Sequence, residues 1–77
     1  MRAYVLVSTA PQTAWDVTRG ARHIKGVTRA DCTRGPYDLV CLIEGPNKEA
    51  LYQIALNGIR GIEGVTGMYT CFVEEDR

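Results

Sequence analysis

Two short segments of the chain are apolar at every position, and they predict the central strands of a β-sheet. Residues 3–7 (AYVLV) and 39–43 (LVCLI) are rich in the β-branched and aromatic side chains that favour strands. Successive side chains of a strand point to opposite faces of the sheet. A strand that is apolar throughout is therefore expected to be covered on both faces.

A third segment, residues 27–34, alternates between apolar and polar positions. Ala30 and Cys32 fall on one side, and Arg29 and Asp31 fall on the other. This pattern predicts a half-buried strand, and its charged side chains favour a place at the edge of the sheet.

Apolar residues at spacings of three and four predict two amphipathic helices between the strands. Their apolar faces are Ala14, Val17, Ala21 and Ile24 in the first helix, and Leu51, Ile54, Ala55, Gly58 and Ile62 in the second. Asn47 is suited to cap the start of the second helix. We expect Gly26 to end the first helix and Gly61 or Gly64 to end the second, with a last strand over residues 65–73.

The chain also repeats a short motif, because residues 23–28 (HIKGVT) return as residues 61–66 (GIEGVT). Each copy follows a predicted helix and opens a predicted strand, so the chain divides into two βαβ-like halves joined by a turn at Gly35 and Pro36. Right-handed crossovers place both helices on one face of a four-stranded antiparallel sheet with strand order 4-1-3-2. The prediction is an α+β, ferredoxin-like βαββαβ fold in a single domain, residues 1–77.

This arrangement leaves one face of the sheet without helices, yet the central strands are apolar at both parities. Val5, Val7, Val40 and Leu42 cannot all face water comfortably, and an exposed apolar sheet marks an interaction surface. Two-fold association, sheet against sheet, covers such a face. We therefore predict a homodimer of the dimeric α/β-barrel type, with these four residues at its interface.

Charge and hydropathy exclude several classes of function. The nine basic and nine acidic residues cancel and alternate in sign along the chain without forming a stripe, so direct binding of nucleic acid is not expected. The apolar runs are far shorter than the roughly 20 residues that span a bilayer, and the N-terminus lacks the apolar core of a signal peptide. We expect a cytoplasmic protein that does not bind membranes.

The spacing of Cys32, Cys41 and Cys71 fits neither a disulfide framework nor a metal-binding pair, so these residues are expected to act as small apolar side chains. Cys32 and Cys41 would be diagonal neighbours across two strands if a two-residue turn joins them. A redox role for this pair stays open.

Candidate catalytic groups are sparse. His23 is the sole histidine, and the pattern places it at the end of the first helix, where a basic side chain suits the helix dipole. Without a second histidine or a carboxylate pair, no nucleophile–base pair, metal site or cofactor is expected. Trp15 lies off the apolar face of its helix, so its ring either folds over the helix–sheet seam or contacts another subunit.

The turn formed by Gly35, Pro36, Tyr37 and Asp38 is the best candidate for a binding site. Backbone N–H groups beside a glycine can hold a carboxylate, and an acidic side chain can hold an ammonium group. Together they match the two charged ends of an α-amino acid. The alternative is a plain hairpin in which Asp38 accepts hydrogen bonds from local amides.

Over residues 3–73 the chain resembles the effector-binding domain of the Lrp/AsnC family of regulators, also called the RAM domain. The resemblance rests on the Gly35-x-Tyr37-Asp38-Leu39 motif, on Gly-Val pairs at both helix ends, and on Thr70 before Phe72 and Val73. It implies a dimer that assembles further, into tetramers or octamers. It also implies that small effectors, mostly amino acids, bind where dimers meet, near the Gly-x-Tyr-Asp loop and the last strand.

Two features depart from the family pattern. Full-length members carry an N-terminal helix-turn-helix domain, whereas Met1 here begins at the first strand, which predicts a stand-alone form that cannot read an operator. The Thr-x-Thr of the family's last strand reads Met68-Tyr69-Thr70 here. Met68 is therefore expected either to favour an effector with an apolar side chain or to mark the loss of amino-acid binding.

These expectations combine into a non-enzymatic, oligomeric sensor of an amino acid or similar metabolite, which modulates transcription by co-assembling with full-length regulators. Its inter-subunit ligand site would comprise Gly35, Pro36, Tyr37, Asp38, Met68 and Thr70. One alternative is a small dimeric α/β-barrel enzyme of the monooxygenase or isomerase type. It is disfavoured because the sheet positions are Val, Leu, Ile and Cys, which do not move protons. The other is an assembly module without a ligand.

Overall fold

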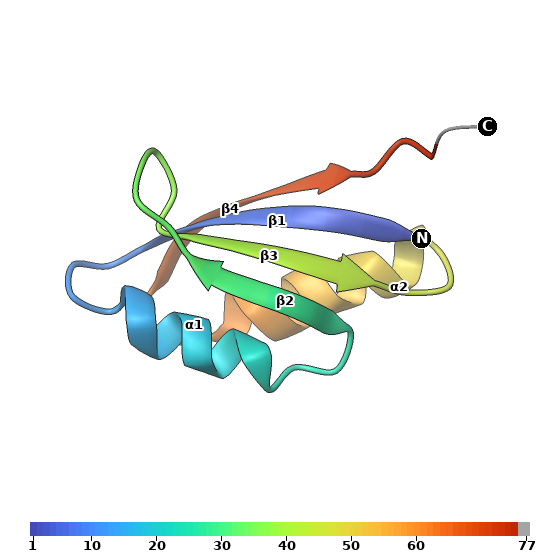
Figure 1. Ribbon diagram of the computed structural model, residues 1–77. Coiled ribbons are helices and arrows are strands. Elements are labelled where there is room, and N and C mark those ends of the chain that lie inside the picture. Colours follow the sequence, from blue (N-terminus) through green and yellow to red (C-terminus); the bar gives the residue numbers. More distant parts are fainter. Residues whose placement is uncertain (76–77) are drawn as a thin grey trace.

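The four predicted strands form one antiparallel sheet in the predicted order. The computed structural model describes residues 1–75, and its strands are β1 (Arg2–Thr9), β2 (Val27–Cys32), β3 (Leu39–Glu44) and β4 (Val65–Phe72). Their order is β2-β3-β1-β4, with β2 and β4 at the two edges (Figure 1). The ferredoxin-like βαββαβ fold is therefore confirmed. Asp76 and Arg77, the end of the predicted domain, lie outside the described residues.

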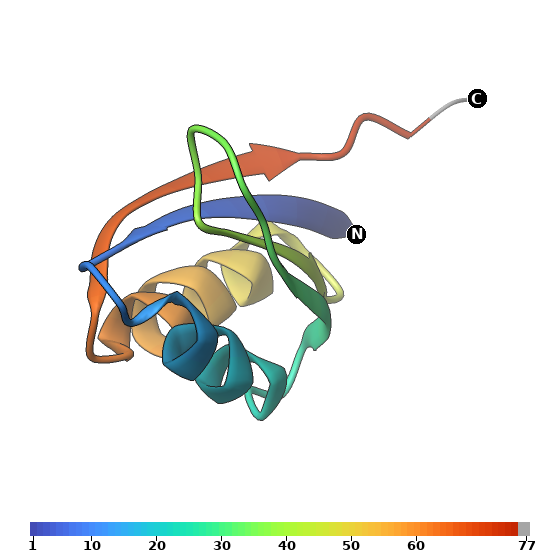
Figure 2. The same ribbon diagram turned by 60° about the vertical axis from the view of Figure 1, so that its left-hand side comes forward.

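Both helical segments cover the same face of the sheet, as Figures 1 and 2 show. The first is α1 (Ala14–Arg22), and the second runs through α2 (Lys48–Tyr52), a π-helical segment η1 (Gln53–Gly58) and a 3₁₀ turn η2 (Ile59–Gly61). The prediction that the first helix extends to Gly26 is wrong, because α1 ends at Arg22 with His23 as its C-cap. Asn47 caps α2 as predicted, since its side-chain oxygen accepts a hydrogen bond from the amide of Ala50 at 2.9 Å.

The repeated motif builds the same turn twice. Gly26 and Gly64 have φ angles of 98° and 105°, in the region that side chains resist. In each copy the amide of the next residue donates to the carbonyl of the isoleucine two positions before the glycine, at 3.1 Å for Val27 and 3.2 Å for Val65. The sequence repeat is thus a structural repeat that directs the chain from each helical segment into a strand.

The core-facing residues of the second helical segment differ from the prediction. Leu51, Ala55 and Ile59 are fully buried at successive spacings of four, because the π-helical segment holds more residues per turn than an α-helix. Ile59 therefore takes the core position predicted for Gly58. Gly58 instead allows Ile24 to pack closely against the backbone of the helical segment, since a Cβ at position 58 would lie 3.0 Å from Cγ2 of Ile24.

The two faces of the sheet have different neighbours. The residues of β1 and β3 under the helices are fully buried: Ala3, Val5, Val7, Leu39, Cys41 and Ile43. The prediction that Val5 and Val7 contact a second copy is therefore wrong, because they lie in the core of their own protomer. Val40 and Leu42 have the opposite parity and lie, partly exposed, on the open face away from the helices.

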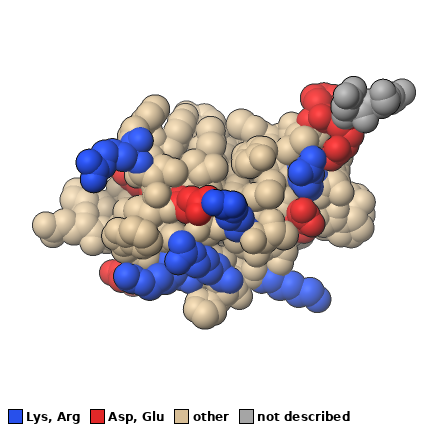
Figure 3. Space-filling model, viewed as in Figure 1, with Lys and Arg blue, Asp and Glu red and all other residues tan. Residues whose placement is uncertain are grey.

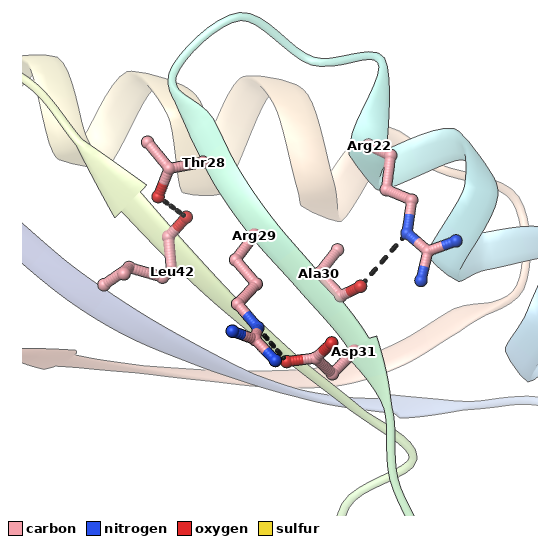
Figure 4. Close-up of polar contacts among 6 residues, drawn as sticks. All are labelled: Arg22, Thr28, Arg29, Ala30, Asp31 and Leu42. Atoms are coloured by element: carbon pink, nitrogen blue, oxygen red, sulfur yellow. Dashed lines mark hydrogen bonds and ion pairs between the residues drawn. The ribbon is translucent and has the colours of Figure 1, made fainter.

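The edge strand β2 carries a β-bulge that shifts the alternation of its side chains between the two faces of the sheet by one residue. Val27 and Arg29 pair with successive residues of β3, so Thr28 is an extra residue between them, and its hydroxyl donates to the carbonyl of Leu42 at 3.1 Å (Figure 4). The bulge keeps both Val27 and Ala30 on the helix side while Arg29 is directed to the open face. The predicted alternation and edge position of this strand are confirmed.

Candidate functional site

The connection between β2 and β3 rises from the sheet on the side away from the helices (Figures 1 and 2). It spans residues 33–38 and is longer than the predicted turn at Gly35 and Pro36. Thr33 closes its base, because its amide donates to the carbonyl of Asp38 at 2.9 Å and its hydroxyl donates to the carbonyl of Tyr37 at 2.8 Å. Gly35 is exposed near the tip with a φ of 146°, and Pro36 beside it is also exposed.

Asp38 fastens this loop to the end of β1. Its Oδ2 accepts a hydrogen bond from the amide of Thr9 at 2.8 Å, and its own amide donates to the carbonyl of Val7 at 2.9 Å. The carboxylate thus accepts from an amide, as the plain-hairpin alternative expects, but the amide belongs to β1 rather than to the turn. A hydrogen bond to a charged acceptor of this kind contributes about 1.5–3 kcal/mol.

Tyr37 brings the loop against the last strand. The rings of Tyr37 and Tyr69 meet edge to face, with centroids 6.0 Å apart and an interplanar angle of 75°. Tyr69 lies on the open face and remains 65% exposed. The contact joins two segments that are far apart in the sequence, the Gly-x-Tyr-Asp loop and β4.

Met68 and Thr70 point to the opposite face from Tyr69. In the register with β1 they pair with Val7 and Val5, which are buried beneath the helices, and Met68 packs against that core. The six predicted ligand residues therefore do not converge within one protomer. The loop residues lie on the open side of the sheet, whereas Met68 and Thr70 lie on the helix side.

A cavity of about 360 Å³ lies at the outer edge of β4. Its lining comprises Arg60, Val65, Thr66, Gly67, Met68 and Tyr69. Arg60 supplies a guanidinium, Met68 supplies an apolar wall, and β4 presents an edge that no described strand of this chain covers. Such a set of groups suits a small carboxylate with an apolar side chain.

Met68 is the one residue of this cavity that sequence reasoning predicted, and the most distinctive of the five that it missed are Arg60 and Tyr69. Arg60 is a single basic residue at the end of a helical segment, so its type and spacing mark no site. Tyr69 could have been found, because it stands between two predicted site residues on a strand. Alternation, however, sends it to the other face, beside Tyr37.

Burial raises the pKa of the Cys41 thiol to about 11, and the carboxylate of Asp31 acts in the same direction. Cys41 therefore stays protonated and unreactive at neutral pH. Cys32 and Cys41 are diagonal neighbours across β2 and β3, as expected, and both are free thiols.

Two further observations concern residues 1–75. Within this range no three His, Cys, Asp or Glu side chains gather in a way that could hold a metal ion. None of the helices in the same range is both long enough and apolar enough to cross a membrane.

The fold of this chain is shared with several solved structures. The chain is similar to TTHA0845 from Thermus thermophilus, with 27% identity, coverage of 99% of this chain and 98% of that chain, and a TM-score of 0.87. It is also similar to E. coli AsnC, with 17% identity, coverage of 97% and 51%, and a TM-score of 0.88. A third structure is that of the transcriptional regulator NMB0573 from Neisseria meningitidis in complex with L-Met, with 18% identity, coverage of 97% and 50%, and a TM-score of 0.83.

The likeness to AsnC and NMB0573 is one of fold, and the chain spans about half of the length of each. The model of the Lrp/AsnC ligand binding domain family matches residues 2–76. The chain therefore belongs to the Lrp/AsnC ligand-binding domain family, as the motifs predicted. A search among curated proteins finds no match.

Proposed function

We propose that this chain is a non-enzymatic sensor that binds an amino acid or a similar small metabolite between subunits and responds by changing its assembly. The observation that carries the proposal is the cavity at the outer edge of β4, where Arg60 and Met68 lie beside a strand edge that no described strand covers. Membership of a ligand-binding family supports it. So does the fold shared with a regulator that was solved with L-Met.

The open face of the sheet is suited to pairing with a second copy. Tyr4, Leu6, Val40, Leu42 and Tyr69 are neighbours in the strand register, and two of them, Tyr4 and Tyr69, are 44% and 65% exposed. A contiguous apolar surface of this kind favours association, and two-fold symmetry covers it with the same surface of a partner. Compared with the predicted interface, this set keeps Val40 and Leu42, has Tyr4 and Leu6 in place of Val5 and Val7 on β1, and adds Tyr69 from β4.

Further assembly of such dimers provides a way to complete the ligand site. The loop formed by Gly35, Pro36, Tyr37 and Asp38 lies on one side of the protomer, and Met68 and Thr70 lie on the other. A site that uses both sets is therefore built from the loop of one subunit and the β4 edge of another. This arrangement favours a tetramer or octamer, in which assembly and effector binding depend on each other.

Within this site we assign roles by chemistry. Arg60 binds the carboxylate of the effector, Met68 contacts an apolar side chain, and Asp38 holds the loop through the amide of Thr9. Co-assembly with full-length Lrp/AsnC regulators would carry the response to transcription. Native mass spectrometry of mixtures with such a regulator tests this last step, because heteromeric species are then expected.

Isothermal titration against the twenty amino acids tests effector binding. We expect at least one apolar amino acid to bind, and Arg60→Gln to weaken it about tenfold, because a charged hydrogen bond of about 1.4 kcal/mol or more is lost. Lys48→Gln, which removes one charge at the start of α2 and away from the cavity, is the matched control and should bind as the parent does. Absence of heat for all twenty at millimolar concentration would reject the effector claim.

Light scattering coupled to size-exclusion chromatography tests assembly separately. A dimer or larger species is expected at micromolar concentration, with a change in its mass when the bound amino acid is added. A folded monomer under these conditions would reject the sheet-to-sheet interface, whatever the calorimetry shows.

A further inference from the structure

Basic side chains gather on one side of the molecule, over α1 and β2 (Figure 3). Five of the nine Lys and Arg residues fall within residues 19–34, and Asp31 is the sole acidic residue in that range. These basic residues are Arg19, Arg22, Lys25, Arg29 and Arg34. Arg19, Arg22 and Lys25 lie on α1 or just after it, and α1 packs beside β2. Arg29 projects from the open face of β2, and Arg34 lies in the loop that follows β2. The balanced charge of the whole sequence conceals this local excess.

Ion pairs neutralise only part of the excess. Arg19 and Arg29 pair with neighbouring aspartates at 3.4 Å and 2.7 Å. Among residues 1–75, no ion pair forms at Arg22, Lys25 or Arg34. Three uncompensated positive charges therefore remain along this side.

Arg22 is held in a defined position at the outer edge of β2. Its Nε donates to the carbonyl of Ala30 at 3.1 Å, as Figure 4 shows. Because the carbonyl is neutral, it does not compensate the positive charge of the guanidinium. The two terminal amino groups of Arg22 remain available to another acceptor. Such a pre-positioned pair of donors matches two oxygens of a phosphate group.

Trp15 continues this line of side chains along α1. Trp15, Arg19 and Arg22 are spaced by four and three residues, so they share one helical face. Trp15 is 55% exposed and does not belong to the core, and the guanidinium of Arg19 lies 5.7 Å from the centroid of its ring. An exposed indole beside basic groups is a platform on which a nucleic-acid base can stack.

We propose that this surface, the α1–β2 basic face, binds single-stranded nucleic acid. It comprises Trp15, Arg19, Arg22, Lys25 and Arg34. The uncompensated cations bind backbone phosphates, and one base stacks on Trp15. An acidic protein partner fits less well, because protein interfaces depend on a cluster of buried apolar anchors and this face offers one aromatic ring.

The single tryptophan of the chain makes the test specific to this face. Its fluorescence is followed while a 20-nucleotide oligo(dT) is added at 50 mM and 200 mM NaCl. We expect quenching in both, with about 20-fold weaker binding at the higher salt, because three phosphate contacts on a single strand give a slope of about −2 in log affinity against log salt. Arg22→Gln should reduce this slope by about 0.7.

Trp15→Leu removes the reporter, so its binding is measured by anisotropy of a labelled oligo(dT), and we expect at least about fivefold weaker binding. Lys48→Gln is the control, with the same change of charge at a distance from the face. Thermal unfolding of each variant shows that these substitutions leave the fold intact, with a loss of no more than about 1 kcal/mol expected for Arg22→Gln, which gives up the hydrogen bond to Ala30.

Several outcomes would overturn the proposal. These are the absence of salt-dependent quenching at 50 mM NaCl, equal quenching by polyglutamate, and equal weakening by Lys48→Gln and Arg22→Gln. Tighter binding to a 20-base-pair duplex without quenching would indicate contact with the phosphate backbone alone, without base stacking. This result would also count against the proposal.

Discussion

Gly26 joins α1 to β2 in a conformation that a side chain resists. Its φ is 98°, and a Cβ at this position would lie 2.3 Å from Cδ1 and 2.9 Å from Cγ1 of Ile54. Gly26→Ala therefore adds backbone strain and also forces Ile54 to move within the region where the helical segments meet the sheet. We expect a large loss of stability from the addition of a single methyl group.

The magnitude follows from three contributions. A positive φ costs a non-glycine residue about 1–2 kcal/mol, and an extra methyl group in a packed region costs about 1–3 kcal/mol. The reduced freedom of the unfolded chain returns about 0.4–1 kcal/mol. The net loss is about 1–5 kcal/mol and centres on about 3 kcal/mol, against a total of about 4–12 kcal/mol for a domain of this length. The melting temperature should fall by about 10–25 °C.

Urea and thermal unfolding followed by circular dichroism measure this loss, at one fixed protein concentration because association also stabilises. Gly61→Ala is the control: nothing lies within 4 Å of its Cβ position, so a change of no more than about 0.5 kcal/mol is expected. Adding Ile54→Val to Gly26→Ala removes the closest atom and should recover part of the loss. A Gly26→Ala protein as stable as the parent would refute the reasoning.

Further predictions concern other parts of the molecule. Because the folded pKa of Cys41 is about 11 and its ordinary value is 9.0, the contribution of Cys41 to stability should be fully present below pH 9 and fall by up to about 3 kcal/mol between pH 9 and 11, a difference that comparison with Cys41→Ala isolates in pH-dependent unfolding. In the native protein at pH 7.5, iodoacetamide should label the exposed Cys71 and leave Cys41 unmodified by mass spectrometry; labelling of Cys41 at the same rate would contradict its burial. Leu42→Asp should convert the assembly to a folded monomer in light scattering, and an unchanged mass would reject the open face as the interface. Asp38→Ala should lower the free energy of unfolding by about 1–3 kcal/mol because the amide of Thr9 loses its acceptor, whereas Asp38→Asn, which keeps an acceptor, should restore most of it.

Local patterns were sufficient to predict the topology. The two apolar segments, the alternating edge strand and the repeated Gly-Val motif depend on neighbours within a few residues, and each appears in the structure as predicted. The motif around Gly35, Tyr37 and Asp38 also identified the family. These features survive folding because strand alternation and the positive φ of a glycine turn are properties of short stretches of backbone.

Local patterns could not predict which face of the sheet the helices cover. A strand that is apolar at both parities does not reveal which parity the helices cover, and for this reason the prediction that Val5 and Val7 lie at the interface is wrong. The family resemblance groups Met68 and Thr70 with the loop, although alternation directs them to the helix side of their own protomer. Assigning these residues requires knowing which helices pack where, and that depends on contacts between distant segments.

What the sequence by itself determined is therefore the order of elements, the strand pairing and the family. Tertiary structure alone decided which apolar side chains are covered, how the loop meets β4 through Tyr37 and Tyr69, and how α1 and β2 bring Arg22 and Trp15 to one side. The physical reason is that backbone geometry acts over a few residues, whereas burial and local charge depend on which distant segments become neighbours.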